Sequence, residues 1–158
     1  MIRALAMDVD GTLTDGKLHI GSHGEIYKTF DVKDGYAIHN MLPTMGIIPI
    51  IITGRKSEIV EWRCKELGIS YVVQGSSDKL HELKKILAKE SIKAEETAYI
   101  GDDLNDLICM KAVGLKGCPK DAVEEIRAIA DFVSHKNGGD GAIREFVEWI
   151  MRRTNCDD

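Results

Sequence analysis

Short apolar runs alternate along the chain with longer segments in which apolar residues recur every three or four positions. The runs are nearly continuous in apolar residues, which is typical of strands buried on both faces of a parallel sheet. Pro49 is unusual inside such a run, because proline has no backbone N–H to donate to a neighbouring strand. The strands predicted by this pattern cover residues 2–8, 47–52, 70–73, 97–100 and 131–134.

The segments between these runs have helical periodicity. In the last of them, Ile143, Val147 and Ile150 lie on one stripe of the predicted helix. Because strands and helices alternate, the chain is predicted to have an α/β fold with a doubly wound, Rossmann-like parallel sheet. The predicted helices cover residues 34–45, 56–67, 78–90, 103–112, 121–129 and 141–153.

One segment interrupts the alternation directly after the first predicted strand. Residues 17–20 and 25–30 flank a glycine-bounded tetrapeptide at 21–24, which predicts a β-hairpin insertion over 17–30. A two-stranded ribbon is marginally stable alone in water, and this one carries several apolar side chains. A symmetric second copy of the chain is the simplest surface to cover them, so we expect an oligomer. These apolar residues are Leu18, Ile20, Ile26 and Phe30.

Length and charge narrow the class of protein. A chain of 158 residues fits a single domain spanning 1–158, and its net charge of −5 disfavours nucleic acid as a partner. No apolar stretch approaches the roughly 20 residues of a membrane helix, and the N-terminus lacks the features of a signal peptide. The four cysteines form no Cys-x-x-Cys pair and are predicted to be free thiols. We therefore expect a cytoplasmic protein without a membrane partner.

Polar residues follow four of the predicted strands. Because the carboxyl ends of parallel strands meet at one edge of a sheet, these side chains are expected to converge there. They include several carboxylates, one threonine hydroxyl and one lysine. In chain order the segments are Asp8-x-Asp10-Gly11, Thr53-Gly54-Arg55, Ser76-Ser77-Asp78-Lys79 and Gly101-Asp102-Asp103-x-x-Asp106.

This set of groups suits the hydrolysis of a phosphate monoester. Carboxylates bind Mg²⁺, and a carboxylate such as Asp8 can attack phosphorus once cations offset the repulsion between the two anions. Asp10 is placed to protonate the leaving oxygen and then to deprotonate water. Lys79 and Thr53 would hold the phosphoryl oxygens. Each segment alone is also compatible with a turn, a helix cap or a surface charge, but their order at four strand ends favours catalysis.

In these four motifs the chain resembles the haloacid dehalogenase superfamily. The resemblance implies that Asp8 is the nucleophile and Asp10 the acid and base. It also implies that Asp8, Asp102 and the backbone carbonyl of Asp10 bind Mg²⁺. Asp103 and Asp106 would lie behind these ligands, where Asp106 orients Lys79 or the surroundings of the metal.

Over nearly the whole chain the sequence is similar to one capless group of that superfamily, the 3-deoxy-D-manno-octulosonate 8-phosphate phosphatases. This resemblance implies that no cap domain is present and that the substrate is a small phosphorylated sugar acid of lipopolysaccharide biosynthesis. It also implies a homotetramer in which neighbouring hairpins pack together and cover the active sites. The resemblance is carried by the hairpin, Lys28-x-Phe30, Asp34-Gly35, Thr53-Gly54-Arg55, Arg63, Gln74-Gly75 and the segment 138–145.

The same resemblance implies a substrate pocket. Besides Asp10 and Lys79, it would be lined by Asp31, Val32, Lys33, Asp34, Gly35, Arg55 and Arg63. The chain departs from the pattern at His39, where a basic residue is expected. A neutral histidine is a weaker partner for a sugar carboxylate, so this departure concerns the identity of the substrate and leaves the reaction unchanged.

Three other functions are compatible with parts of the pattern. The first is the same reaction on a nine-carbon sugar-acid 9-phosphate, such as KDN or an N-acylneuraminate; Arg55 favours the octulosonate, since an acidic residue is expected there in the nine-carbon enzymes. The second is hydrolysis of a generic small phosphate. The third is a non-catalytic assembly module related to domains linked to cytidylyltransferases. Such modules lose motif residues, whereas Asp8, Asp10, Thr53, Lys79 and Asp102 are all present.

Overall fold

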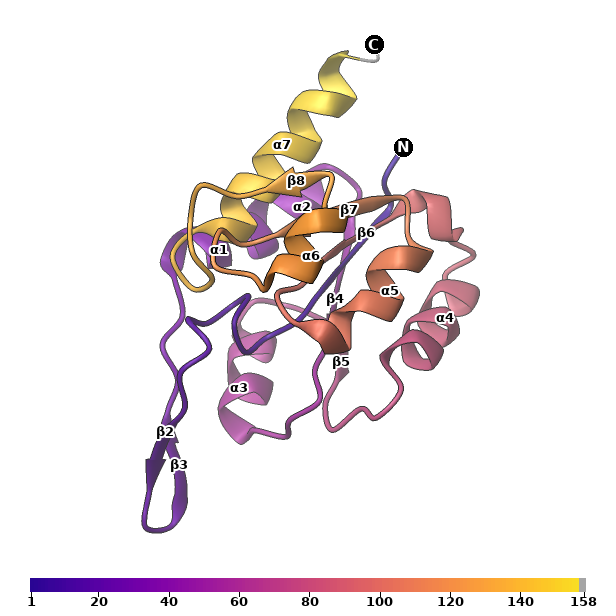
Figure 1. Cartoon of the computed structure of the whole chain (residues 1–158). Coiled ribbons are helices and arrows are strands. Elements are labelled where there is room, and N and C mark those ends of the chain that lie inside the picture. The colour runs from indigo at the N-terminus through magenta and orange to yellow at the C-terminus, as the bar shows by residue number, and fades with distance from the viewer. Residues whose placement is uncertain (157–158) are drawn as a thin grey trace.

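The computed structural model describes residues 1–156 and contains a six-stranded, all-parallel sheet with helices on both faces (Figure 1). The strand order is β5-β4-β1-β6-β7-β8, so the chain winds outward in both directions from β1. This confirms the predicted doubly wound α/β fold. The strands are β1 (Ala4–Met7), β4 (Ile48–Ile52), β5 (Tyr71–Val73), β6 (Thr97–Ile100), β7 (Leu115–Cys118) and β8 (Phe132–Val133).

The helices divide between the two faces of the sheet. Their bounds are α1 (Val32–Tyr36), α2 (Leu42–Thr44), α3 (Glu58–Glu66), α4 (Lys79–Lys89), α5 (Leu107–Ala112), α6 (Glu124–Ile129) and α7 (Ala142–Cys156). Buried residues of α3 and α7 share one apolar core with the 37–42 segment, and those of α4, α5 and α6 share the other. Side chains of β1 alternate between the two, Leu5 and Met7 facing the first, Ala4 and Ala6 the second.

Pro49 fits the interior strand β4 because of where the neighbouring strand begins. Ile48 donates its N–H to Arg3 of the segment before β1, so the N–H missing at Pro49 would face the β5 side. Pairing with β5 begins only at Ile50, opposite Tyr71. The proline therefore removes no hydrogen bond from the ladder.

Strand β7 was not among the predicted strands. Lys116 and Gly117 break its apolar pattern, and glycine is unfavourable in strands. The structure gives a reason for Gly117: a Cβ atom there would come within 2.8 Å of the ring of Phe146 on α7. Close packing of a helix on the sheet thus determines this residue, and a pattern of local hydrophobicity does not reveal it.

The hairpin is present but shorter than predicted. It consists of β2 (His19–Gly21) and β3 (Gly24–Tyr27), and it projects from the body of the molecule (Figure 1). Ile20 and Ile26 are 57% and 63% exposed, whereas Phe30 packs against the core that α3 and α7 share. Within one chain, then, the tip of the hairpin is uncovered and Phe30 belongs to its root.

Two helical predictions are corrected. The helix expected over 34–45 begins earlier, at Val32 of α1, and contains a π-helical turn at Ala37–Met41 before α2. The last helix was predicted to end at residue 153, but α7 continues to Cys156. Among residues 1–156, no helix is both long and apolar enough to cross a membrane.

Candidate active site

Three central strands bring the motif residues together. Since β1 lies between β4 and β6, the residues that follow these strands, Asp8, Thr53 and Asp102, meet at one edge of the sheet. A cavity of about 170 Å³ opens at this edge. It is lined by Asp8, Asp10, Thr53, Gly54, Arg55, Asp103 and Asn105.

The inner part of the site is a buried ion-pair cluster around Lys79. This lysine is the first residue of α4, whose N-terminus is capped by the Asp78 carboxylate. Its Nζ lies 3.0 Å from Asp8 Oδ1 and 2.9 Å from Asp106 Oδ1. Burial disfavours the charged lysine, but the two carboxylates outweigh burial and raise the pKa of Lys79. The lysine therefore carries its positive charge directly beside the predicted nucleophile.

Asp106 holds the cluster in place and has no free oxygen. Its Oδ1 accepts hydrogen bonds from Lys79 and from the Tyr99 hydroxyl at 2.6 Å, and its Oδ2 accepts from the backbone N–H groups of Asp102 and Asp103. One oxygen from each of Asp8, Asp102 and Asp106 lies within 4.8 Å of the others. Because both oxygens of Asp106 are engaged by donors, this geometry favours a supporting role for Asp106 over metal ligation.

The remaining carboxylates fit a divalent cation. Burial, together with the negative charge of Asp106, raises the pKa of Asp8. Burial and the neighbouring Asp8 raise the pKa of Asp102 to about 8. Crowded carboxylates with raised pKa values are stabilised by a hard cation that prefers oxygen ligands, as Mg²⁺ does. Asp8, Asp102 and the Asp10 carbonyl are the groups that would hold it.

The loop after β1 packs tightly against the loop after β6. The Thr12 hydroxyl donates to Asp102 Oδ1 at 3.0 Å, which orients that carboxylate. Gly11 has a φ of +93°, and a Cβ atom on it would lie 1.9 Å from Asp102 Oδ2. Glycine is therefore required at position 11 both for its backbone conformation and for the approach of Asp102.

The outer part of the site surrounds Asp10 and involves the hairpin. Lys28, one residue past β3, donates from Nζ to Asp10 Oδ1 at 2.6 Å, and its side chain is only 2% exposed. Arg55 Nε lies 3.8 Å from the other oxygen of Asp10. Burial opposes the charge of Lys28, but Asp10 and Glu25 raise its pKa above the usual range. The predicted acid and base thus lies between two cations.

The predicted substrate residues at 31–35 lie apart from this cavity. Asp31 caps α1 by accepting from the N–H groups of Lys33 and Asp34. Asp34 is buried and accepts from the N–H of Arg144 at the start of α7; burial raises its pKa to about 6. Lys33, like Val32, is exposed. Within one chain these contacts are structural, so the role of residues 31–35 in substrate binding stays a prediction.

Arg63 and His39 line a second hollow, of about 320 Å³, between α1 and α3. The Arg63 guanidinium lies over the Phe30 ring and so close to Gly35 that a Cβ there would be 2.5 Å from Nη2. His39 Nδ1 lies 2.9 Å from the carbonyl oxygen of Leu67 just after α3. Of the two arginines predicted to bind substrate, the structure thus brings only Arg55 into the strand-end cavity.

The sequence patterns missed several residues of the site. Asn105 lies inside the fourth motif and lines the cavity, yet only the aspartates of that motif were singled out. Thr12 and Tyr99 act through Asp102 and Asp106, and Tyr99 looks like any core residue of a strand. Lys28 is 18 positions from Asp10, and in the sequence it stood out only as part of the segment Lys28-x-Phe30 that carries the family resemblance.

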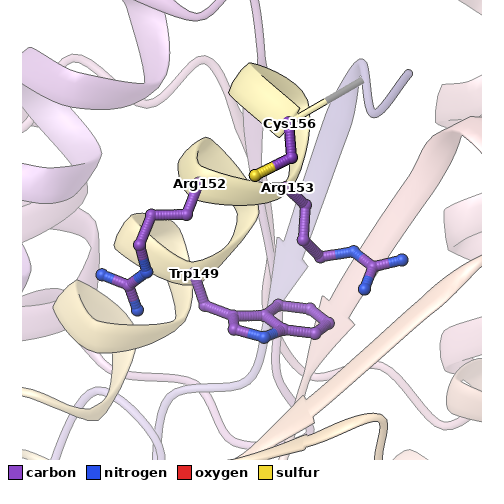
Figure 2. Close-up of a pocket in the computed structure, with 4 residues that line it drawn as sticks. All are labelled: Trp149, Arg152, Arg153 and Cys156. Carbon is purple, nitrogen blue, oxygen red and sulfur yellow. The ribbon is translucent and has the colours of Figure 1, made fainter. Parts of the chain in front are cut away.

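A further hollow, of about 280 Å³, lies at the C-terminal end of α7 (Figure 2). Arg152 and Arg153 extend to opposite sides of the Trp149 indole, with Cys156 nearby, and Arg153 Cζ is 4.8 Å from the indole centroid. None of the strand-end motif residues lines it. It is therefore separate from the candidate active site.

Comparison with known proteins agrees with this geometry. Residues 52–146 match the family model of the haloacid dehalogenase-like hydrolases. The chain belongs to this family. It is also 45% identical over 150 residues to the 3-deoxy-D-manno-octulosonate 8-phosphate phosphatase KdsC of Salmonella typhi, covering 95% of this chain and 79% of the relative. The membership confirms the resemblance seen in the four motifs.

Solved structures of related phosphatases superpose closely on this haloacid dehalogenase-like chain. The 3-deoxy-D-manno-octulosonate 8-phosphate phosphatase of Yersinia pestis has a TM-score of 0.92 at 42% identity, with 96% of this chain and 81% of that chain covered. The enzyme of Moraxella catarrhalis has a TM-score of 0.91 at 44% identity, with 96% and 86% covered. That structure contains a magnesium ion, a phosphate ion and a KDO molecule. The shared architecture confirms the predicted capless α/β fold.

Proposed function

We propose that this protein is a Mg²⁺-dependent phosphatase that converts 3-deoxy-D-manno-octulosonate 8-phosphate to 3-deoxy-D-manno-octulosonate and phosphate, a reaction of lipopolysaccharide biosynthesis. The observation that carries the proposal is the buried contact of Lys79 with Asp8 and Asp106, in which Asp8 also lines a cavity together with Asp10 and Thr53. Similarity to phosphatases of this substrate over 95% of the chain supports the choice of sugar.

The arrangement supports a two-step reaction. An oxygen of Asp8 attacks phosphorus, the bond from phosphorus to the sugar oxygen breaks, and Asp10 donates a proton to that oxygen. Asp10 then takes a proton from water, the water oxygen attacks the phosphorus, and phosphate leaves as the Asp8 carboxylate is restored. Lys79 and the Thr53 hydroxyl hold the phosphoryl oxygens throughout. Bound Mg²⁺ would supply positive charge that offsets the anions of enzyme and substrate.

Arg55 is the side chain best placed to recognise the sugar acid. It lines the cavity, is 47% exposed and adjoins Asp10. Arginine can bind a carboxylate through two parallel hydrogen bonds, so it suits the carboxylate that lies far from the phosphate of such a substrate. This role separates the proposed substrate from small phosphates without a carboxylate.

We also propose that the protein works as a cytoplasmic homotetramer in which hairpins of neighbouring chains pack together. The exposed Ile20 and Ile26 support it, because a ribbon with such side chains is marginal alone. Replacing both isoleucines by aspartate is expected to give monomers in light scattering at micromolar concentration. Ile108→Asp, which changes a similarly exposed residue on α5, is the control. A wild type that is monomeric would contradict the proposed assembly.

Metal dependence tests the proposed chemistry. Exhaustive chelation is expected to abolish phosphate release, and Mg²⁺ to restore it, because the site collects buried carboxylates. Calcium should inhibit, since its higher coordination number disturbs the geometry of attack. Full activity after complete metal removal would contradict the proposal.

A further inference from the structure

Two charged side chains of the hairpin segment reach the candidate active site of their own chain. Glu25 lies on β3 and Lys28 follows it, and both side chains turn toward the loops that carry the cavity residues. The tip of the same hairpin carries the exposed Ile20 and Ile26. One short element thus carries exposed apolar side chains and sheltered charged ones close together: Glu25 pairs with Ile20 across the ribbon and directly precedes Ile26.

These charged side chains form a chain of contacts that ends on Asp10. The Ser57 hydroxyl donates to Glu25 Oε1 at 2.5 Å, and Glu25 Oε2 lies 3.0 Å from Lys28 Nζ. Lys28 Nζ donates to Asp10 Oδ1 at 2.6 Å. Arg55 connects the same two acids by a second route, 3.8 Å from Asp10 and 4.0 Å from Glu25.

Lys28 has a buried side chain, and we therefore take it as the residue that fixes Asp10. Its side chain is 2% exposed, whereas the side chain of Arg55 is 47% exposed and free to meet a substrate. An ammonium held between two carboxylates has few alternative positions, so it fixes the carboxylate oxygen to which it donates. With Oδ1 of Asp10 held by Lys28, the other oxygen is the one on the side of Arg55, and both residues line the cavity.

We propose that Lys28 is a positioning residue that holds Asp10 in the orientation for proton transfer, and that Glu25 and Ser57 hold Lys28. This inference rests on the proposed function of Asp10 as acid and base. It also couples assembly to catalysis, because the hairpin that carries the exposed Ile20 and Ile26 also carries the lysine that orients Asp10.

Steady-state kinetics of Lys28→Met test the inference. Misplacement of a catalytic group by about 1 Å can cost on the order of a hundredfold in rate, so kcat is expected to fall by about ten- to a hundredfold while KM stays within about twofold. Lys28→Arg should recover part of the loss, because it keeps the charge in a different shape. Lys17→Met, an exposed lysine of the same hairpin segment, is the matched control and should leave kcat unchanged.

A double-mutant cycle separates positioning from a general loss of packing. If Glu25 acts through Lys28, Glu25→Gln lowers kcat by about threefold in the wild type and has little effect when Lys28→Met is already present. Light scattering and thermal unfolding on each variant show whether the assembly and the fold are retained. Should Lys28→Met fail to fold, Lys28→Arg and Glu25→Gln carry the test, and kcat at the wild-type level in both overturns the inference.

Two results with folded Lys28→Met overturn it as well. One is a kcat within twofold of the wild type. The other is a raised KM with unchanged kcat, which would make Lys28 a substrate contact. Wild-type turnover of the octulosonate phosphate and of p-nitrophenyl phosphate is measured in parallel, so a wrong substrate assignment is distinguished from a wrong role for Lys28. If only p-nitrophenyl phosphate is hydrolysed, the Lys28 variants are compared with the wild type on that substrate.

Discussion

Asp8 and Asp10 lie two residues apart on one loop, yet they are held by different parts of the molecule. Asp8 contacts Lys79 at the start of α4 and faces Asp106, which is itself fixed by the core residue Tyr99. Asp10 contacts Lys28 from the hairpin, an element with little core of its own. The proposed nucleophile is thus held by the packed sheet and the proposed acid and base by the inserted hairpin, so the two should respond differently to the same kind of substitution.

The largest effect is expected at the anchored residue. Asp8→Asn should lower turnover by about three orders of magnitude or more, because it removes the proposed covalent nucleophile. The amide is similar in size to the carboxylate, and burial already disfavours a charge at this position, so the protein should still fold. Phosphate release and circular dichroism on the same sample check both statements. Turnover near the wild-type rate in a folded sample would exclude Asp8 as the nucleophile.

A smaller loss, in a different step, is expected at Asp10. Asp10→Asn should lower kcat by about 10²–10⁴-fold, since it lacks the proposed base that activates water. With a good leaving group such as p-nitrophenolate, attack by Asp8 still proceeds, so phosphorylated Asp8 should accumulate. Mass spectrometry of the quenched enzyme detects it. The covalent route is contradicted if no variant, including this one, ever yields the phosphorylated residue.

Arg55 tests how the substrate is recognised on the Asp10 side of the site, because it adjoins Asp10 and lines the cavity. Arg55→Ala should lower kcat/KM on 3-deoxy-D-manno-octulosonate 8-phosphate by about ten- to several-hundred-fold, the loss of a charge-assisted hydrogen bond of roughly 1.5–3 kcal/mol. p-Nitrophenyl phosphate, which has no carboxylate, should be little affected. Lys56→Ala, the exposed neighbour, is the control. Equal losses on both substrates would assign Arg55 to the phosphate or to the fold.

For a change of one pH unit, the smallest expected effect is the pH dependence of metal binding. The pKa of Asp102 is about 8 in the folded, metal-free protein, above its ordinary value of 3.8, so folding binds a proton there. Stability of the metal-free protein therefore falls as pH rises from about 4 to about 8. Mg²⁺ needs the ionised carboxylate, so its affinity should rise over the same window, by up to about tenfold per pH unit.

Calorimetry in buffers of different ionisation enthalpy measures the proton released on Mg²⁺ binding. Asp102→Asn should bind Mg²⁺ weakly and with less proton release. An affinity independent of pH between 6 and 8 would contradict the assignment of Asp102 as a ligand that must lose a proton.

The difference between the two aspartates also separates what the sequence predicts from what it does not. Position after a strand is enough to predict that four residues belong to the site, because the carboxyl ends of parallel strands lie at one edge of the sheet. These residues are Asp8, Thr53, Lys79 and Asp102. The contact of Lys28 with Asp10 depends on how an irregular arm folds back, which no periodicity encodes. For the same reason β7 was missed: Gly117 is set by the ring of Phe146.

The residues at 31–35 show the opposite difficulty. Resemblance predicted a substrate role for Asp31 and Asp34, while the structure gives each of them hydrogen bonds to backbone N–H groups at helix starts. A carboxylate that caps a helix and one that binds a ligand cannot be told apart by residue type. Contacts within one chain account for the capping and leave the substrate role as a prediction.

Hydrolysis of 3-deoxy-D-manno-octulosonate 8-phosphate with Mg²⁺ is tested most directly by kcat/KM values across a series of sugar-acid phosphates. The octulosonate 8-phosphate should be hydrolysed with kcat/KM at least about tenfold above that for a nine-carbon sugar-acid 9-phosphate and for p-nitrophenyl phosphate, a margin equal to about 1.4 kcal/mol of transition-state binding. A higher kcat/KM for the nine-carbon substrate would contradict the substrate assignment. No phosphate release from any of them, with Mg²⁺ present and the protein folded, would contradict the enzyme activity itself.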